Sequence, residues 1–325
     1  MKTLWRPATK ADDDIVGRLV PDGRLPSHDG GFVVVVVLLA LGLLALVAAS
    51  FSLAVRSQLR TTASLSASAQ AEAFADAGIN IAMLDLLAAR EDRTRKRRFP
   101  VDGTAIGCML KDGVSLVIGV QDEAGRVDLN AAGEVLLKAL LRGSGLSDSR
   151  SSELAERILD FRDRDDERRA LGAERADYTA AGLPGPKDAA LDAIEEVGQV
   201  LGADAELINR MRPFVTVHSG LGGVDPKVAP ASLLAILSSG YAAAGSSGTA
   251  VPPLANRGVL PAPLVEISPQ QIYAIRSEVV TAEGARFVRD VTVDLGARRT
   301  RSHIFRRWQR GSSAASPVPG PLPPC

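Results

Sequence analysis

The 325-residue sequence predicts an α+β protein with one long N-terminal helix, a helical central block and strands on both sides of that block. Three observations carry this prediction. An uncharged run from Phe32 to Val55 continues into helix-forming sequence up to Arg90. Alternating β-branched residues follow at 113–121, and two further alternating segments come after residue 270. Apolar residues make up 46% of the chain and charged residues 23%, as in ordinary globular proteins.

The apolar run predicts a membrane-spanning helix. No charge occurs between Phe32 and Val55, and at ~1.5 Å rise per residue a helix of that length crosses a ~30 Å hydrocarbon core. A secretory signal peptide has a shorter apolar core, followed by a small-residue cleavage site. Here the small pair Gly30-Gly31 precedes the run instead. The local residues leave two alternatives open: cleavage that removes the leader and keeps the helix, or an uncleaved anchor.

The helix is expected to continue beyond the membrane. Between Arg56 and Arg90 there is no proline and a single glycine, Gly78. Apolar residues recur there at a spacing of three or four, which predicts an amphipathic helix that packs against a domain. The residues of this expected packing stripe are Phe74, Ala77, Ile81, Leu84 and Ala88.

The central block and the C-terminal segments follow in order. Glu283-Gly284 separates the alternating segments 271–280 and 285–294, which predicts a β-hairpin, and 301–308 is a candidate third strand. Two segments of the block begin alike, because a Val-Asp pair at 127–128 and again at 224–225 precedes a polar turn and an apolar helix. Helices are predicted at 132–142, 148–162, 188–202, 204–212 and 230–238.

The sequence contains no catalytic constellation, and we expect a protein that is not an enzyme. Its three histidines, His28, His218 and His303, have no second histidine or cysteine at ligand spacing, and no nucleophile elbow or phosphate-binding loop is present. The two cysteines, Cys108 and Cys325, could pair in an oxidising compartment or remain free thiols.

An acidic cluster in the central block is the candidate metal site. Several carboxylates within one turn and loop suit Ca²⁺, which takes six to eight oxygen ligands. Arginines interleave with these acids, so the alternative is a solvated helix end with surface ion pairs. The candidate ligands are Asp160, Asp163, Asp165, Asp166, Glu174 and Asp177.

Charge argues against nucleic-acid binding, although Val197–Arg212 faintly resembles a helix-hairpin-helix motif. Residues 122–220 hold 20 acidic and 13 basic side chains, whereas phosphate binding needs a basic surface. Residues 271–311 hold nine arginines and four acids. These indicate first the solvent face of a sheet and second a surface for an acidic partner.

The order of these parts resembles a known family. A Gly-Phe junction before an apolar helix that continues as a long amphipathic helix resembles type IV pilin-like proteins. The helical block resembles the minor pseudopilin K of the type II secretion system (general secretion pathway protein K). The segments that carry this resemblance are DEAGRVDLNAA (122–132), ILDFRDRDDERRALGAERADY (158–178), INRMRPFVTVHSG (208–220) and VDPKVAPASLLAIL (224–237).

The resemblance implies a processed assembly protein. A prepilin peptidase would cut between Gly31 and Phe32 and methylate the new N-terminus. The fifth mature position is then Val36, whereas most pilins have glutamate there and the K subunit typically lacks it. The protein would cap the pseudopilus tip with the minor pseudopilins I and J and help initiate assembly for export of folded proteins across the outer membrane. Ca²⁺ could bind in the helical insertion.

The same resemblance implies a single-pass inner-membrane protein with its large C-terminal domain in the periplasm. The fold would be a long N-terminal helix on a small antiparallel sheet, with a large all-helical inserted subdomain. The alternative function is an uncleaved anchor that displays a periplasmic binding module. The expected parts are a leader (1–31), the N-terminal helix (32–98), first strand or strands (99–124), the helical insertion (125–240), a linker (241–265), C-terminal strands (266–310) and a disordered tail (311–325).

Overall fold

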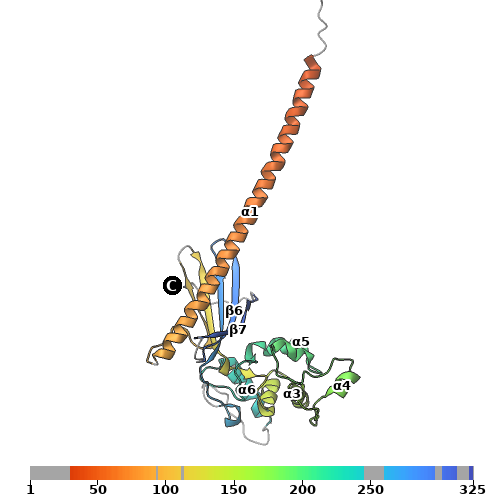
Figure 1. The fold of residues 1–325 in the computed structure, drawn as a ribbon, viewed down its shortest axis with the longest axis vertical. Helices are drawn as coiled ribbons and strands as arrows, with labels where there is room; N and C mark the ends of the chain where they lie inside the picture. Colours follow the sequence, from red (N-terminus) through yellow and green to blue (C-terminus); the bar gives the residue numbers. More distant parts are fainter. Residues whose placement is uncertain are drawn as a thin grey trace, which may run out of the picture. The chain divides into compact units, whose positions relative to one another are not determined.

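The computed structural model describes residues 30–92, 94–110, 113–244, 260–296, 302–312 and 322–324. The expected fold class is confirmed, because a long N-terminal helix accompanies an antiparallel sheet and a set of further helices (Figure 1). Residues 1–29 of the expected leader lie outside the described residues, as do most of the expected linker and tail. The chain divides into two compact units between Thr62 and Ala63.

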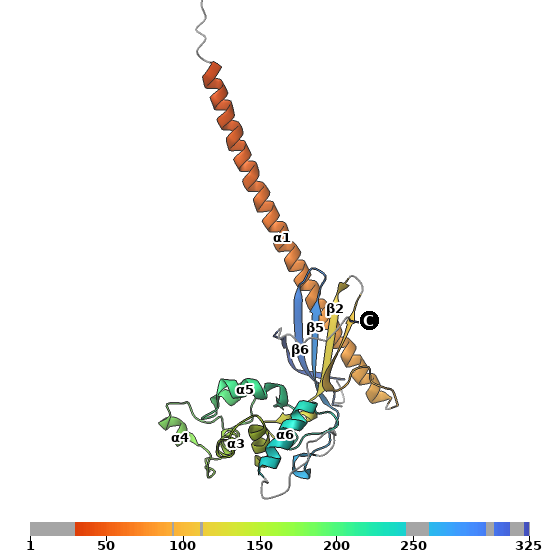
Figure 2. The same cartoon turned by 180° about the vertical axis from the view of Figure 1, so that it is seen from behind.

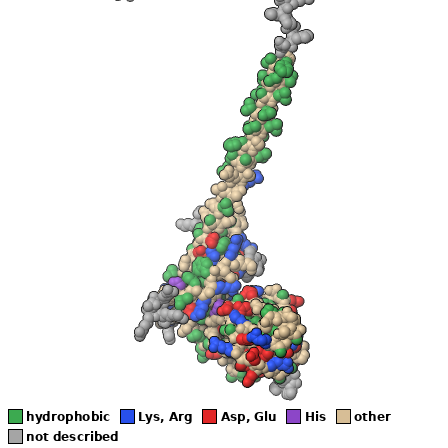
Figure 3. All heavy atoms as spheres, turned by 45° about the vertical axis from the view of Figure 1, so that its right-hand side comes forward, with side chains coloured by type: hydrophobic (Ala, Val, Ile, Leu, Met, Phe, Trp, Pro, Cys, Tyr) green, Lys and Arg blue, Asp and Glu red, His purple; other side chains and the backbone are tan. Residues whose placement is uncertain are grey.

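Helix α1 runs from Gly30 to Glu91 without a break. Within the described residues it is the one helix that is long and apolar enough to cross a membrane, and its most apolar window has a mean hydropathy of 3.2 with no part buried. Hydrophobic side chains cover this part of the helix in Figure 3. The hydroxyls of Ser50, Ser57 and Thr61 donate to backbone carbonyls three or four residues earlier, so these polar groups are satisfied inside the helix.

Five antiparallel strands form the sheet in the order β1-β2-β5-β6-β7. The predicted hairpin after residue 270 is confirmed, since β5 pairs with β6 from Ile272↔Asp294 to Val280↔Arg286, and the third C-terminal strand is confirmed as β7. The strand predicted at 113–121 is β2. The strands are β1 (Asp102–Met109), β2 (Ser115–Asp122), β5 (Ile272–Val280), β6 (Arg286–Asp294) and β7 (Ile304–Arg310).

The C-terminal part of α1 packs on this sheet through small residues. Ala71, Ala75 and Ala82 are fully buried, together with the larger Ile79, against apolar side chains of β2, β5 and β6. A Cβ added at Gly78 would overlap the Ser277 hydroxyl and lie 3.0 Å from a Leu116 methyl group, so a side chain there would displace the side chains of β2 and β5.

The predicted packing stripe is therefore wrong. Phe74 is 37% exposed, Ile81 40% and Leu84 66%, and Ala77 is also exposed. Bulky apolar residues suggested the packing face, but close helix–sheet contact favours the neighbouring face of small residues. The stripe consequently points away from the protein's own core.

Buried polar contacts fix the rotation of α1 about its axis. Arg289 on β6 is largely buried, and its guanidinium donates to Asp76 at 2.6 Å and to Glu72 at 2.5 Å. At the other end, the Asp85 carboxylate accepts from the backbone N–H of Arg98 at 2.9 Å and of Phe99 at 3.2 Å. The ion pairs of Arg289 and the backbone hydrogen bonds of Asp85 together use three acids of α1.

The helical block lies between β2 and β5 in the chain and has its own hydrophobic core (Figure 2). The central residues of this core include Leu140, Leu154, Phe161 and Tyr178. A short parallel pair, β3 (Val127–Asp128) with β4 (Val215–Thr216), also belongs to the block, so the expectation of an all-helical subdomain is wrong in this detail. Its helices are α2 (Glu134–Gly143), α3 (Asp148–Arg162), α4 (Arg175–Ala180), α5 (Ala205–Met211) and α6 (Ala231–Ala244).

The prediction of a helix at 188–202 is wrong, because only the 3₁₀ helix Ile194–Gln199 forms there. Asp188 has φ of 54°, and its backbone N–H donates to the Phe161 carbonyl. The Leu191 N–H donates to the Asn130 side chain at 2.7 Å. These hydrogen bonds hold the segment in an extended conformation next to α3. In an α-helix the same N–H groups would donate to carbonyls of the helix itself.

The two similar Val-Asp segments form the same turn. The Asp128 side chain accepts from the Asn130 N–H at 2.7 Å, and the Asp225 side chain accepts from the Lys227 N–H at 2.9 Å. The backbone carbonyl of each aspartate then accepts from residues three and four positions later. Each aspartate therefore organises a turn before a helix of the block, α2 and α6, and these two helices pack against each other.

We predict that Gly78→Val destabilises the protein by about 1–3 kcal/mol, since any branched side chain overpacks the contact with Ser277. Thermal unfolding of the full chain in detergent micelles measures the effect. Ala77→Val is the matched control, because Ala77 is exposed one residue earlier on the same helix. Equal melting temperatures for the two variants would contradict the close approach.

Candidate functional site

The acidic cluster is built on the end of α3 and the loop that follows it. Asp160 lies in the last turn of α3 and is fully buried, and Asp163 caps the helix C-terminus. Glu174 precedes the first residue of α4 and is also buried. A Cβ added at Gly172 would lie 1.9 Å from the Asp160 Oδ2 atom, so the loop passes directly over the buried carboxylate.

Arg169 carries the positive charge of this cluster. Its guanidinium contacts the Asp160 carboxylate and lies 2.6 Å from Asp163 Oδ2, and its backbone N–H donates to Asp160 at 3.2 Å. These hydrogen bonds raise the pKa of the guanidinium further above its usual range, so it stays charged. Arg169 is thus a single positive charge that pairs with two acids of the cluster, Asp160 and Asp163.

Glu174 is left without a partner. Both of its carboxylate oxygens are buried and accept no hydrogen bond, and the same holds for Asp163 Oδ1 and Asp188 Oδ1. Burial, and then the nearby charges of Asp160, Asp163, Asp188 and Asp166, raise the pKa of Glu174 to about 7. Buried carboxylates without partners are costly, and an added cation would satisfy them.

The structure brings three of the six candidate ligands together: Asp160, Asp163 and Glu174. Asp165 and Asp166 are exposed, and Asp165 accepts from the Glu167 N–H at 3.0 Å. Asp177 is held by the Glu174 N–H at 3.0 Å and by Arg168 at 3.1 Å. Within the described ranges, no three His, Cys, Asp or Glu side chains form a preassembled metal group.

Asp188 was missed by sequence reasoning, because it lies 14 positions beyond Glu174. Its only sequence signal is its place after a Gly-Pro pair, and its positive φ is a property of the folded loop. Arg175 holds its second oxygen at 2.8 Å.

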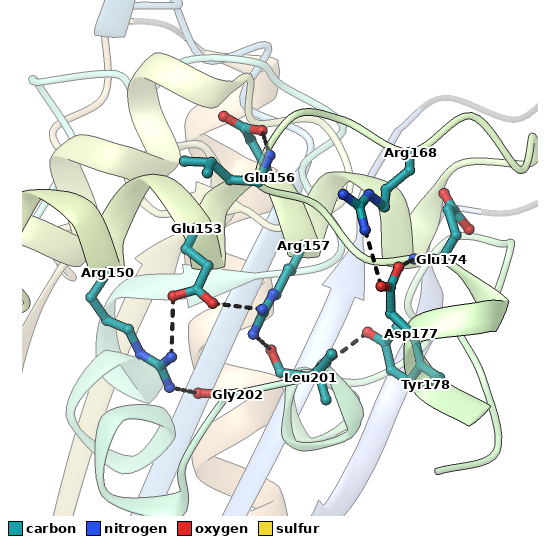
Figure 4. A network of polar contacts seen from close by, with 11 residues as sticks. Arg150, Glu153, Glu156, Arg157, Arg168, Glu174, Asp177, Tyr178, Leu201 and Gly202 are labelled. Atoms are coloured by element: carbon teal, nitrogen blue, oxygen red, sulfur yellow. Dashed lines mark hydrogen bonds and ion pairs between the residues drawn. The ribbon is translucent and has the colours of Figure 1, made fainter. Parts of the chain in front are cut away.

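A polar network fixes α3, α4 and the segment around Leu201 relative to one another (Figure 4). Arg157 donates to the Leu201 carbonyl at 3.0 Å, and the Leu201 N–H donates to the buried Tyr178 hydroxyl at 3.0 Å. Arg150 donates to the Gly202 carbonyl at 2.6 Å, and Glu153 bridges both arginines. The loop that carries Glu174 is thereby anchored on two sides.

The exposed face of α1 is the second candidate site. It consists of the four outward residues Phe74, Ala77, Ile81 and Leu84, which we call the outer stripe. Buried side chains of the same helix face the sheet, so no described part of the chain covers the outer stripe. An apolar stripe at helical spacing is the kind of surface that packs against another helix.

The predicted processing residues lie at the start of α1. Gly31 and Phe32 fall in its first turn, and Phe32 is 74% exposed. Val36 is also exposed.

Cys108 on β1 is disulfide-bonded, and no described cysteine is a free thiol. The alternative of a free thiol is thus wrong for Cys108. Cys325 is the one other cysteine in the sequence.

These features define a class of protein. A long N-terminal helix with an apolar first half, packed by its second half on an antiparallel sheet, is the architecture of the type IV pilin-like class that the sequence resembled. The helical block between β2 and β5 distinguishes this member of the class.

A family model matches β2 and most of the helical block. Residues 115–220 match the family model described as "Type II secretion system (T2SS), protein K". The match covers less than half of the chain, and it confirms the resemblance of the chain to the minor pseudopilin K. None of the curated proteins matches the sequence.

A solved structure has a similar fold. It is a chain of the crystal structure of the GspK-GspI-GspJ complex from the enterotoxigenic Escherichia coli type 2 secretion system. The TM-score is 0.50 at 19% sequence identity, and the match covers 79% of this chain and 99% of that chain. At this identity the match shows the fold.

Proposed function

We propose that the protein is a non-enzymatic subunit that caps the tip of the type II secretion pseudopilus together with the minor pseudopilins I and J. There it would help initiate assembly for export of folded proteins across the outer membrane. The family match over residues 115–220 and the similar fold of a chain in a GspK-GspI-GspJ complex support this proposal.

The observation that carries the proposal is the outer stripe of α1. Its three large side chains are 37–66% exposed, although each would gain free energy by burial at about 25 cal/mol per Å². The protein's own sheet already packs against the neighbouring, small-residue face of α1. A helix of another pseudopilin is therefore the partner that the stripe fits.

We expect Ile81→Glu combined with Leu84→Glu to weaken association with the cognate I and J subunits at least tenfold, because the two charges would be buried in the helix contact. Co-purification of the three full-length subunits in detergent measures this. Val135→Glu is the control, since Val135 is 50% exposed on α2 of the helical block. Unchanged association for the double variant would exclude the outer stripe as the partner surface.

We propose further that α1 anchors the protein in the inner membrane and that the large domain lies in the periplasm. The apolar first half of α1 supports a single crossing. The disulfide at Cys108 supports an oxidising compartment for the domain, because such bonds persist outside the reducing cytosol.

Processing at Gly31–Phe32 is the step that turns this anchor into an assembly subunit. We expect the mature membrane form to begin at Phe32 with a methylated amine, and intact-mass analysis of the purified protein measures its N-terminus. Gly31→Leu should block the cleavage and retain the leader, whereas Gly42→Leu within the same helix should not. A wild-type chain that keeps residues 1–31 would instead support the uncleaved anchor.

The acidic cluster is proposed to bind Ca²⁺. The buried oxygens of Glu174 and one oxygen each of Asp163 and Asp188 lack partners, which fits a hard cation that takes oxygen ligands. With Asp160 they would hold the ion, and the ion would supply positive charge that Arg169 alone does not provide. The bound ion would fix the loop between α3 and α4.

We predict that chelation of Ca²⁺ lowers the melting temperature of the full chain in detergent, and more at pH 8 than at pH 6. The pKa of Glu174 near 7 lies above its usual value, so without a cation this group destabilises the fold as pH rises through 7. Asp163→Ala combined with Glu174→Gln should abolish the effect of chelation, whereas Glu167→Gln, at an exposed acid of the same loop, should not. If chelation left the melting temperature of the wild type unchanged, the cluster would be a set of ion pairs and not a Ca²⁺ site.

A further inference from the structure

Two adjoining cavities lie where the helical block meets the face of the sheet opposite α1. Their volumes are about 530 and 780 Å³, and we call them together the sheet cleft. The sheet and the helical block lie next to each other in Figures 1 and 2. The two cavities share a wall, to which the 3₁₀ helix contributes Ile194 and Glu195 and strand β7 contributes Arg307 and Gln309.

The floor of the larger cavity crosses every strand of the sheet. One row of residues in register runs from β1 to β7: Ala105, Gly119, Arg276, Asp290 and Gln309. Gly119 lies between Ile118 and Val120, which pack towards α1, so this row is on the other face. Four strand spacings make the row about 19 Å long, which an extended chain of roughly six residues would cover.

Arg307 brings an unpaired positive charge to the shared wall. It is half-buried, and its guanidinium makes no hydrogen bond or ion pair with any residue that the structure describes. The neighbouring arginines differ, because Arg212 pairs with Glu195 and Arg276 lies 3.1 Å from Asp290. The Arg307 donors are therefore available to a group from outside the described chain.

Two further groups of the sheet cleft are buried without partners. Arg126 donates to one oxygen of Glu123 at 3.2 Å, but its Nε atom has no acceptor. The second oxygen of Glu123, Oε2, accepts no hydrogen bond. Both residues line the smaller cavity, and Arg126 also lines the larger one. Buried polar groups without partners cost free energy, which a ligand that pairs with them would recover.

A peptide suits these groups better than a simple anion does. An anion has acceptors for Arg307 and Arg126 but no donor for Glu123. A peptide offers an acidic side chain to the arginines, in charge-assisted hydrogen bonds, and backbone N–H groups to Glu123. The nine arginines and four acids of residues 271–311 also give the C-terminal strands a net positive charge, which favours an acidic partner.

We propose that the sheet cleft binds an extended segment of a partner protein that carries an acidic side chain. Arg307 and Arg126 bind the carboxylate, and Glu123 accepts a backbone N–H of the segment. The segment lies across the sheet along the row from β1 to β7. This inference uses the face of the sheet opposite α1, so it does not rest on the outer stripe or on the proposed secretion function.

The test uses the full chain in detergent micelles and a six-residue peptide with one central glutamate among alanines and threonines. The peptide carries an N-trifluoroacetyl group and a C-terminal amide, and ¹⁹F NMR measures its binding against empty micelles. A second peptide has glutamine in place of the glutamate. We expect the glutamate peptide to bind about tenfold more tightly, because a hydrogen bond to an ionised group is stronger than one to an amide.

Two variants locate the binding site. Arg307→Gln should remove the preference for glutamate, whereas Arg210→Gln is the matched control, since Arg210 is an exposed arginine on α5 outside the lining of the sheet cleft. Gly119→Val should weaken binding of the glutamate peptide about fivefold by filling the floor. An added Cβ at Gly119 meets no atom closer than 3.7 Å, so this variant should keep the wild-type melting temperature.

Three outcomes would overturn the proposal. Equal binding of the two peptides to the wild type would exclude recognition of a carboxylate. A glutamate preference that survives in Arg307→Gln, or binding that Gly119→Val leaves unchanged, would place the peptide outside the sheet cleft. Displacement of the peptide by an equal concentration of acetate would show a site for free carboxylates and not for a peptide segment.

Discussion

The close contact between the small-residue face of α1 and the sheet is the constraint on which the rest of the structure depends. Gly78 and the buried alanines allow the helix to lie against β5, and Arg289 fixes its rotation through Glu72 and Asp76. Once that face is used, the bulky apolar residues of the helix must point outward. A single packing choice thus stabilises the protein's own domain and leaves the surface that we assign to a partner helix.

In the helical block, the stability depends on how buried acidic side chains are neutralised by a basic side chain from another segment. Arg169 compensates Asp160 and Asp163, whereas Glu174 and one oxygen of Asp188 remain without partners. The network of Arg150, Arg157 and Tyr178 holds the surrounding segments in place. A rigid frame around carboxylates that lack partners is the arrangement in which a cation stabilises a fold, since the cost of gathering the acids is met when the ion binds.

Much of the fold could be predicted from the sequence. The uninterrupted helix, the β5–β6 hairpin and α3 agree closely with their expected ranges, because each depends on local patterns: absence of proline, alternation about a Glu-Gly turn, and a run of helix formers. Predictions failed where contacts between residues distant in sequence determined the local structure. In the segment 188–202, backbone N–H groups donate to the Phe161 carbonyl and the Asn130 side chain instead of forming an α-helix. Helix α4 is too short for a helical periodicity to be visible in the sequence.

The candidate functional site likewise has features that the sequence predicts and features that only the folded structure shows. The sequence by itself determined the apolar helix, the Gly31-Phe32 junction, the acids at the end of α3 and the family that these parts resemble. Only the tertiary structure decided which face of α1 is buried, that Asp188 joins Asp160, Asp163 and Glu174, and that Arg126 and Arg307 line one cleft. The physical reason is that composition and spacing specify local geometry, whereas burial and partnership depend on residues that only folding brings together.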